Sequence, residues 1–230
     1  MEPSMSKFIF PIAAAMLLLC ASSACADETA RALPPPAFDT EGPQNSASET
    51  AVLAGGCFWG MQGVFQHVKG VKQVTAGYSG GGGDTAHYET VGTGRTGHAE
   101  SVEIVFDPRA VTYGQILRIY FSVMDPTTLN YQDPDEGTQY RSEIFFAGPA
   151  QQHIAQAYVV QLTKARAFSQ RIVTQLGALN RFYPAEGYHQ NYLINHPDQP
   201  YIAINDIPKI ATLRRLYPQF YMDRPVTLTR

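Results

Sequence analysis

Residues 51–60 read AVLAGGCFWG and place one cysteine, Cys57, at the junction of two predicted elements. The apolar run Ala51–Ala54 predicts a short strand, the glycine pair after it predicts a turn, and residues 57–67 predict a helix. A thiol at a helix start lies near unpaired backbone N–H groups and the positive end of the helix dipole, which favour a thiolate. We therefore expect the pKa of Cys57 to lie below its ordinary value of about 8.5.

The neighbours of Cys57 help to distinguish a reactive thiol from a structural one. A lone free cysteine is commonly a buried packing residue. Here Phe58 and Trp59 follow the thiol directly, and Trp59 is the only tryptophan in the chain. They could form an apolar slot for a small group that bears a methyl or a sulfur atom. This context favours a reactive cysteine.

The composition excludes several classes of protein. The chain has 230 residues, with 17 Lys and Arg against 20 Asp and Glu, so it lacks the basic excess that nucleic-acid binding requires. Its three cysteines form no C-x-x-C pair, and its six histidines show no H-E-x-x-H or H-x-H spacing. We therefore expect no disulfide scaffold and no metal site.

The first 26 residues predict a secretory signal peptide. Lys7 supplies a positive charge, Phe8–Leu19 is an apolar run too short to span a membrane, and Ala-Cys-Ala at 24–26 matches the small-residue cleavage pattern. We therefore expect an exported, periplasmic protein. An uncleaved anchor and lipid attachment at Cys25 are the alternatives, and the translation start, Met1 or Met5, is left open.

Processing of this segment also decides the thiol count. Cleavage would remove Cys20 and Cys25, and lipid attachment would occupy Cys25. Either route leaves Cys57 as the one free thiol, which then has no intramolecular disulfide partner in an oxidising compartment.

The remaining chain predicts a linker and one α+β domain. Residues 27–50 contain three consecutive prolines and no periodicity, which predicts a disordered or extended linker before a domain over 51–230. After residue 67 we expect strands over Val71–Ala76, Ser101–Phe106, Ser142–Phe146 and Gln170–Gln175. We expect helices that begin at Thr112, with a capping box to Gln115, that span Pro149–Ala167 and that lie near Lys209–Tyr217. Residues 77–97 and 125–139 predict loops. The mixture indicates a sandwich built on one sheet.

Glu100 lies where the third predicted strand begins. It shares one face of that strand with Val102, Ile104 and Phe106, because alternate residues point to the same side. If this is the core face, burial raises the pKa of Glu100 and keeps it protonated, as a general acid requires. The alternative is that Glu100 stands beyond the strand end in solvent, and the sequence leaves both open.

Several polar residues form a second group of candidates. Tyr88, Tyr140 and Tyr192 fall in polar, loop-like contexts, where their phenol O–H groups could stabilise an oxygen that develops negative charge. Each of them could equally be a half-buried packing residue. Asp135 stands in the sequence DPDEG, which is typical of a solvated turn, and His189 could be an ordinary polar residue.

Four ordered blocks give the sequence a specific resemblance. They are GCFWG at 56–60, GHAESV at 97–102, GTQYRS at 137–142 and YHQNY at 188–192. Together they resemble the A-type peptide methionine sulfoxide reductases, and the resemblance extends over about 51–217. It implies a two-layer α+β sandwich of ferredoxin-like type and a substrate that is the S-epimer of methionine sulfoxide, in proteins or free.

The resemblance also implies roles for individual residues. Cys57 corresponds to the nucleophile and Glu100 to the proton donor. The other correspondences are Phe58 and Trp59 around the sulfoxide methyl group, Tyr88 and Tyr140 on the sulfoxide oxygen, and Asp135 and Tyr192 in substrate binding. The residues beside Asp135 depart from the family pattern, which weakens that one assignment.

This chemistry would convert Cys57 to a sulfenic acid, the reversible first stage of thiol oxidation, and we expect it to need no metal and no organic cofactor. Many relatives resolve it with further cysteines near the C-terminus, whereas residues 201–230 contain none here. We therefore expect an external thiol, thioredoxin-like or small, to reduce Cys57 in a monomeric enzyme. The competing interpretations are a one-cysteine thiol peroxidase and a non-catalytic redox-sensing module.

Overall fold

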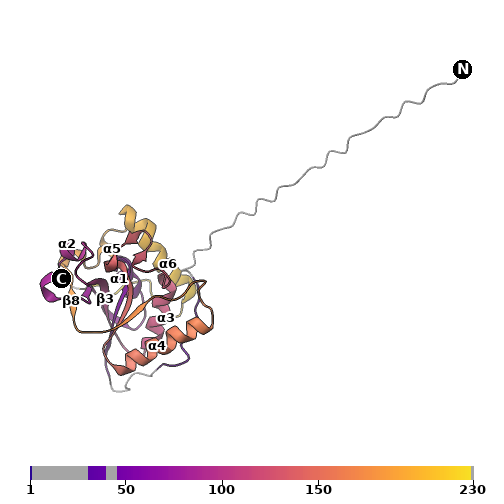
Figure 1. Cartoon of the computed structure of the whole chain (residues 1–230). Helices are drawn as coiled ribbons and strands as arrows, with labels where there is room; N and C mark the ends of the chain where they lie inside the picture. Colours follow the sequence, from indigo (N-terminus) through magenta and orange to yellow (C-terminus); the bar gives the residue numbers. More distant parts are fainter. Residues whose placement is uncertain (2–30, 40–45, 229–230) are drawn as a thin grey trace.

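The computed structural model describes Met1, residues 31–39 and residues 46–228 (Figure 1). Apart from Met1, the predicted signal peptide lies outside the described residues, as do residues 27–30 and 40–45 of the predicted linker. In the part of the chain that is described, no helix is long and apolar enough to cross a membrane.

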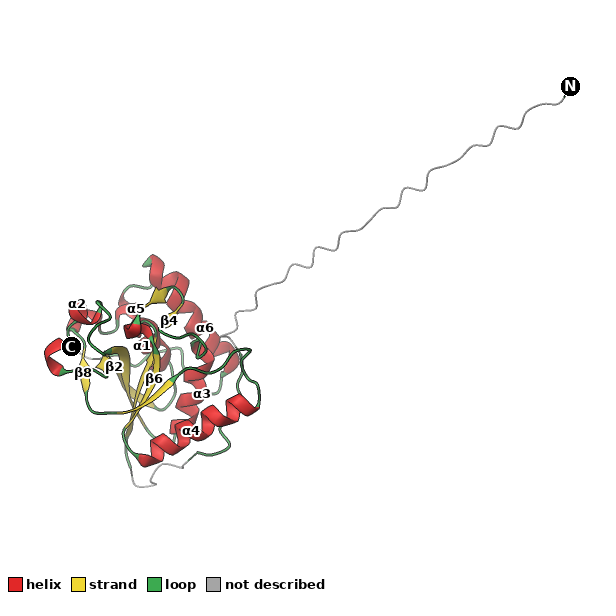
Figure 2. Cartoon of the chain, viewed as in Figure 1, coloured by secondary structure: helices red, strands yellow, loops and turns green. Residues whose placement is uncertain are grey.

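A mixed β-sheet organises the fold (Figure 2). In the described chain it contains β1 (Glu49–Gly55), β2 (Val71–Ser79), β3 (Ala99–Phe106), β6 (Ser142–Phe146), β7 (Gln175–Ala178) and β8 (Phe182–Pro184). Their order is β7-β6-β1-β3-β2-β8, and all neighbours are antiparallel except the parallel pair β6 and β7. A separate small hairpin joins β4 (Tyr131–Gln132) to β5 (Asp135–Glu136).

Helices cover this sheet and complete an α+β fold. The α-helices are α1 (Phe58–Gln66), α2 (Tyr88–Val91), α3 (Tyr113–Val123), α4 (Pro149–Lys164), α5 (Tyr192–Asn195) and α6 (Ile207–Leu216). Three short 3₁₀-helices, η1 (Gly83–Thr85), η2 (Thr138–Tyr140) and η3 (Gly187–His189), and a π-helix, η4 (Ile202–Asp206), complete the described elements. Helix α1 packs on β1, β2 and β3, α4 packs on β6 and β7, and α3 contacts both α4 and α6. The predicted α+β class with one mixed sheet is confirmed.

Local sequence signals explain where α3 begins but not where β7 begins. The capping box predicted at Thr112 is present, because its side chain accepts from the Gln115 N–H while the Gln115 side chain accepts from the Thr112 N–H. The strand predicted over Gln170–Gln175 is wrong. Val173 donates its N–H to the loop carbonyl of Pro126, and pairing with β6 begins only at Gln175, opposite Glu143.

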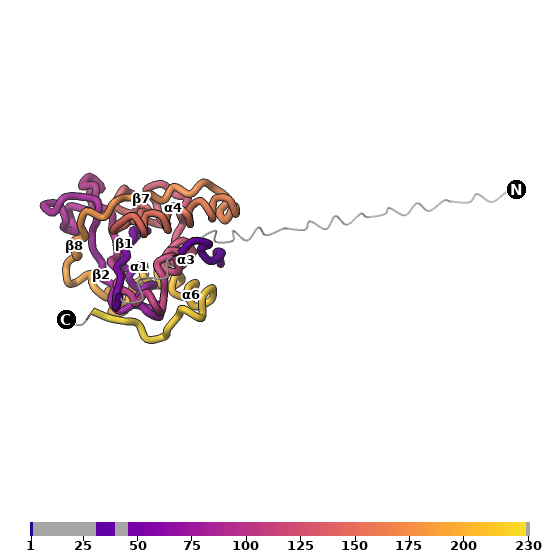
Figure 3. Tube along the Cα trace, turned by 90° about the horizontal axis from the view of Figure 1, so that it is seen from below, coloured from indigo at the N-terminus to yellow at the C-terminus, as the bar shows by residue number. Residues whose placement is uncertain are grey.

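Residues 31–39 differ from the linker expected over 27–50. They have no helix or strand, but they pack against the domain as a strap beside α3 (Figure 3). Leu33 is only 2% exposed, its N–H donates to the Tyr217 hydroxyl at 3.0 Å, and its carbonyl accepts from Arg118 Nε at 2.7 Å. The Pro34 carbonyl accepts from the Tyr158 hydroxyl at 2.8 Å. Proline keeps the segment extended and leaves its carbonyls free to accept, so the strap joins α3, α4 and the end of α6.

Replacing Leu33 by alanine should therefore destabilise the whole domain. Loss of a fully buried leucine side chain lowers the free energy of unfolding by about 2–5 kcal/mol, measured by urea denaturation. Val160→Ala on the exposed face of α4 is the matched control and should stay within about 0.5 kcal/mol of the parent. Equal stabilities of the two variants would show that the strap is not part of the core.

Candidate active site

Cys57 lies at the N-terminus of α1, directly after β1 and Gly56. It is 7% exposed and occupies the N-cap position, as the sequence predicts. Gly56 has a positive φ of 87°, and a Cβ there would lie 2.7 Å from Gln132 Cβ. Only glycine fits both the backbone conformation and the space, so the turn that presents the thiol depends on Gly56.

The predicted lowering of the Cys57 pKa is wrong. Burial raises the pKa of the Cys57 thiol well above its ordinary value, and the carboxyl groups of Glu100 and Asp206 raise it further. A hydrogen bond from the Trp59 backbone N–H and the cation of Lys209 act in the opposite direction but are outweighed. The helix start is present, but its electrostatic effect is smaller than the cost of placing a charge in this enclosed site.

Glu100 lies on the core face of β3, which settles the question that the sequence leaves open. It is 4% exposed, and Val102, Ile104 and Phe106 on the same face are fully buried. Its Oε2 accepts a hydrogen bond from the Phe58 backbone N–H at 3.0 Å. Burial raises the pKa of Glu100 to about 8, with smaller contributions from Asp135 and Asp206, although the Phe58 hydrogen bond opposes the rise. Most Glu100 side chains therefore carry a proton at pH 7.

An aromatic wall borders this pair. Trp59 stacks on Tyr192 with ring centroids 4.0 Å apart and an interplanar angle of 12°. Its Nε1–H donates to His189 Nδ1 at 3.2 Å, and the Phe58 ring lies 6.5 Å from the Tyr88 ring. The structure thus brings the predicted residues Phe58, Trp59, Tyr88 and Tyr192 together, with His189 as the residue that links them.

Tyr88 and Tyr140 approach the same centre from α2 and η2. Burial raises the pKa of both phenols, to about 12 for Tyr88, and the nearby Glu100 and Cys57 raise them further. Both hydroxyls therefore keep their protons at neutral pH and can donate hydrogen bonds. Asp135 on β5 is half-buried and accepts a hydrogen bond from the Tyr201 hydroxyl, so it is not the solvated turn residue that its sequence context suggests.

The sequence analysis missed three residues that line the far side of the site. Tyr201 holds Asp135, and Asp206, which is fully buried, accepts a hydrogen bond from Lys209 Nζ at 3.0 Å. The spacing of Asp206 and Lys209 is compatible with an ion pair on a helix, but nothing in the sequence indicates that the pair is buried beside Cys57.

Asp206 also explains the second glycine of GCFWG. A Cβ at Gly60 would lie 2.1 Å from Asp206 Oδ1, closer than any two nonbonded atoms can approach. The first turn of α1 and the Asp206 carboxylate therefore touch, and Gly60 makes that contact possible.

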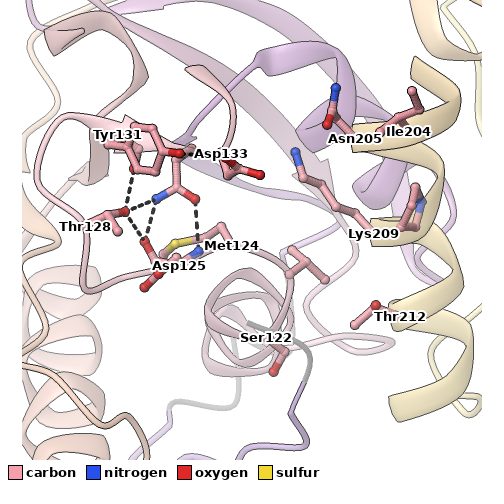
Figure 4. A pocket seen from close by; sticks show the side chains of 13 residues that line it. Ser122, Met124, Asp125, Thr128, Tyr131, Asp133, Ile204, Asn205, Lys209 and Thr212 are labelled. Carbon is pink, nitrogen blue, oxygen red and sulfur yellow. Dashed lines mark hydrogen bonds between the residues drawn. The ribbon is translucent and has the colours of Figure 1, made fainter. Parts of the chain in front are cut away.

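A pocket of about 350 Å³ adjoins the site (Figure 4). The end of α3, the loop and hairpin around Tyr131, η4 and α6 form its walls, and Lys209 extends into it from α6. Gln132, which packs against Gly56, and Lys209, which pairs with Asp206, each belong to both the pocket and the rear of the site. The two spaces thus share a wall.

Replacing Gly60 by alanine tests this close contact. The added methyl group must displace Asp206 or the start of α1, and overpacking of this kind lowers the free energy of unfolding by about 1–3 kcal/mol in urea denaturation. Gly187→Ala is the control, because a Cβ there meets no atom within 4 Å. If the two variants were equally stable, α1 and Asp206 would not be in contact.

Comparison with known proteins agrees with this geometry. The family model described as "Peptide methionine sulfoxide reductase" matches residues 49–219. A curated relative from Mesorhizobium japonicum, "Peptide methionine sulfoxide reductase MsrA 2", is 59% identical over 180 residues, which cover 78% of this chain and 92% of the relative.

Two solved structures are similar in fold. Methionine sulfoxide reductase A of Corynebacterium diphtheriae is 35% identical with a TM-score of 0.58, and the match covers 69% of this chain and 78% of that one. Reduced Mxr1 from Saccharomyces cerevisiae is 29% identical with a TM-score of 0.60, over 68% and 90% of the two chains. The buried thiol and carboxyl, the aromatic wall and these matches agree: the chain belongs to the A-type peptide methionine sulfoxide reductase family.

Proposed function

We propose that Cys57 is the nucleophile and Glu100 the proton donor in the reduction of methionine S-sulfoxide to methionine, the activity of the family. One observation carries the assignment: a carboxyl group that holds its proton at neutral pH is bonded to the backbone of Phe58, the residue next to Cys57. Sulfoxide sulfur is a weak electrophile until its oxygen is protonated. An acid and a thiol in one buried site supply both requirements.

The step transfers one oxygen atom. Glu100 gives its proton to the sulfoxide oxygen, the Cys57 sulfur attacks the sulfoxide sulfur, and the proton that the thiol releases returns to Glu100. The attack forms a transient S–S bond; the oxygen then passes to the Cys57 sulfur, so that one S–O bond forms there while the substrate S–O bond and the S–S bond break. Methionine leaves, and Cys57 holds the oxygen as a sulfenic acid. Tyr88 and Tyr140 support the step by donating hydrogen bonds to the oxygen as negative charge develops on it.

The aromatic wall accounts for substrate selection. Phe58 and Trp59 provide an apolar surface for the sulfoxide methyl group, and the stack of Trp59 on Tyr192 holds the indole ring in place. Asp135, held by Tyr201, offers a carboxylate at the rim that can orient the substrate by accepting hydrogen bonds. Because the slot holds the methyl group at the end of the side chain, both free and protein-bound methionine sulfoxide can bind there.

Recycling requires thiols from outside the chain. Cys57 is the one free cysteine among the described residues, and residues 201–230 contain no other. An external thiol attacks the sulfenic acid, releases water and forms a mixed disulfide with Cys57; a second thiol then restores the Cys57 thiol and leaves as a disulfide. A thioredoxin-like exported protein or a small thiol can fill this role.

We also propose a finer description of the fold and of the working form. The chain order β1-α1-β2-β3-α3-β6 and the antiparallel sheet order β6-β1-β3-β2 support a two-layer, ferredoxin-like unit. We propose a monomer as the working form, and size-exclusion chromatography tests it. The signal-like residues 1–26 support export to the periplasm, with lipid attachment at Cys25 as the alternative, and the intact mass of the secreted protein distinguishes the two.

Two substitutions test the catalytic roles. Cys57→Ser should abolish formation of methionine from a sulfoxide substrate with dithiothreitol, and Glu100→Gln should slow it roughly a hundredfold or more because the acid is lost. Methionine is quantified by chromatography, and Glu103→Gln, on the opposite face of β3, is the control that should retain activity. Full turnover by Cys57→Ser would contradict the proposal, and peroxide consumption without methionine formation would support a thiol peroxidase instead.

The pH dependence follows from the protonation of Glu100. The single-turnover rate of methionine formation should fall as the pH rises through about 8, because an ionised Glu100 has no proton to give. Ionisation of Cys57 acts in the opposite direction, and Glu100→Gln separates the two effects since its slow rate should show no such fall. A wild-type rate that climbs steadily to pH 10 would remove the acid role of Glu100.

A further inference from the structure

Asp206 is a buried carboxyl group that the reaction described above does not use. Burial raises its pKa, and the Lys209 cation opposes that rise. Its side chain is fully buried, Oδ1 accepts from Lys209 Nζ at 3.0 Å, and Oδ2 has no hydrogen-bond partner. An unpartnered carboxylate oxygen in the interior costs free energy. An unsatisfied polar atom in a buried position calls for an explanation.

The backbone places Asp206 next to the first turn of α1, the helix that begins after Cys57. Asp206 ends the π-helix η4, which runs directly into α6, and both elements pack on α1. π-helical turns are rare and occur frequently at functional sites. The contact with Gly60 brings the carboxylate against the first turn of α1, which begins at Cys57.

The groups that face Cys57 and Glu100 come from several elements. They are Tyr78 on β2, Tyr88 on α2, Asp135 on β5, Tyr140 on η2, Tyr201 before η4, Asp206 on η4 and Lys209 on α6. His189 on η3 packs against the ring of Phe58, the residue after Cys57. Of the groups that act electrostatically on Cys57, Lys209 is the one cation in the described chain. Asp206 partly neutralises it through their hydrogen bond.

We propose that the Asp206–Lys209 ion pair is a charge-setting and positioning element for Cys57 and Glu100. This inference rests on the proposed function of those two residues. Asp206 disfavours negative charge on both, so Glu100 keeps the proton that it must donate and Cys57 rests as a thiol. Lys209 opposes the effect at Cys57 and makes the thiolate accessible once substrate is bound. Together they hold acid and nucleophile in the protonation states from which the reaction starts.

Opposite charge changes in the pair provide the test. Asp206→Asn removes a negative charge and leaves Lys209 unopposed, so Cys57 should react about tenfold faster with iodoacetamide at pH 8. Lys209→Met removes the cation that favours the thiolate and should slow the same reaction. The effect should be smaller than that of Asp206→Asn, because burial already raises the pKa of Asp206 and the loss of Lys209 raises it further. The double variant should return toward the wild-type rate. Alkylation is measured in the full chain by mass spectrometry of the peptide that contains Cys57.

The direction in which each variant changes the alkylation rate separates an effect of charge from an effect of altered structure. Unfolding or loosening exposes a buried thiol and speeds alkylation in every variant, whereas the proposal requires Lys209→Met to be slower than the wild type. Asp198→Asn, which removes an exposed negative charge from the same region, is the control and should leave the rate unchanged. Changes in the same direction for both single variants, or none beyond this control, would overturn the proposal.

Single-turnover reduction supplies a second measurement. In Asp206→Asn the fall in rate at alkaline pH should begin at lower pH than in the wild type, because Glu100 loses a neighbouring negative charge and ionises more readily. An unchanged pH profile would overturn the role at Glu100. If the wild type formed no methionine, the proposed function would fail, whereas the alkylation series would still decide whether the ion pair sets the charge state of Cys57.

Discussion

The hydrogen bond from the Phe58 N–H to Glu100 Oε2 is the contact on which the site depends. It joins the first turn of α1 to the core face of β3, and it satisfies an N–H group at the helix start that has no partner within the helix. Through it, the Glu100 carboxyl group and the residue after Cys57 occupy one enclosed space. The aromatic wall, the phenols of Tyr88 and Tyr140 and the Asp206–Lys209 pair are arranged around that connection.

Burial has a different consequence for each of the two reactive groups. It raises the pKa of Glu100 to about 8, which suits the acid role that we propose, and it also raises the pKa of Cys57, which keeps this side chain a thiol in the resting protein. A resting thiol is protected from unwanted oxidation, which follows thiolate character and exposure. The enclosed site therefore favours reaction with a sulfoxide that is already bound next to the acid.

Much of the fold follows from local patterns in the sequence. The capping box at Thr112, the apolar strand after residue 50 and the alternation of Glu100 with Val102 and Ile104 are signals that act over a few residues, and the structure contains all three features. The expected strand at Gln170–Gln175 fails because edge pairing depends on where β6 lies, which local pattern does not encode. The prediction that residues 31–39 form a free linker is wrong for the same reason, since the hydrogen-bond partners of Leu33 lie more than eighty residues away in the sequence.

For the site, the amino-acid sequence is enough to identify the chemical groups: one thiol between glycines and aromatic residues, a carboxyl group on an apolar strand face, and four ordered blocks of the family. The charge state of these groups, by contrast, depends on how the chain folds. The pKa of Cys57 depends on enclosure and on Asp206, which is distant in sequence and reaches α1 only because Gly60 has no side chain. Electrostatic effects in a buried site depend on distances between elements, and those distances exist only once the chain has folded.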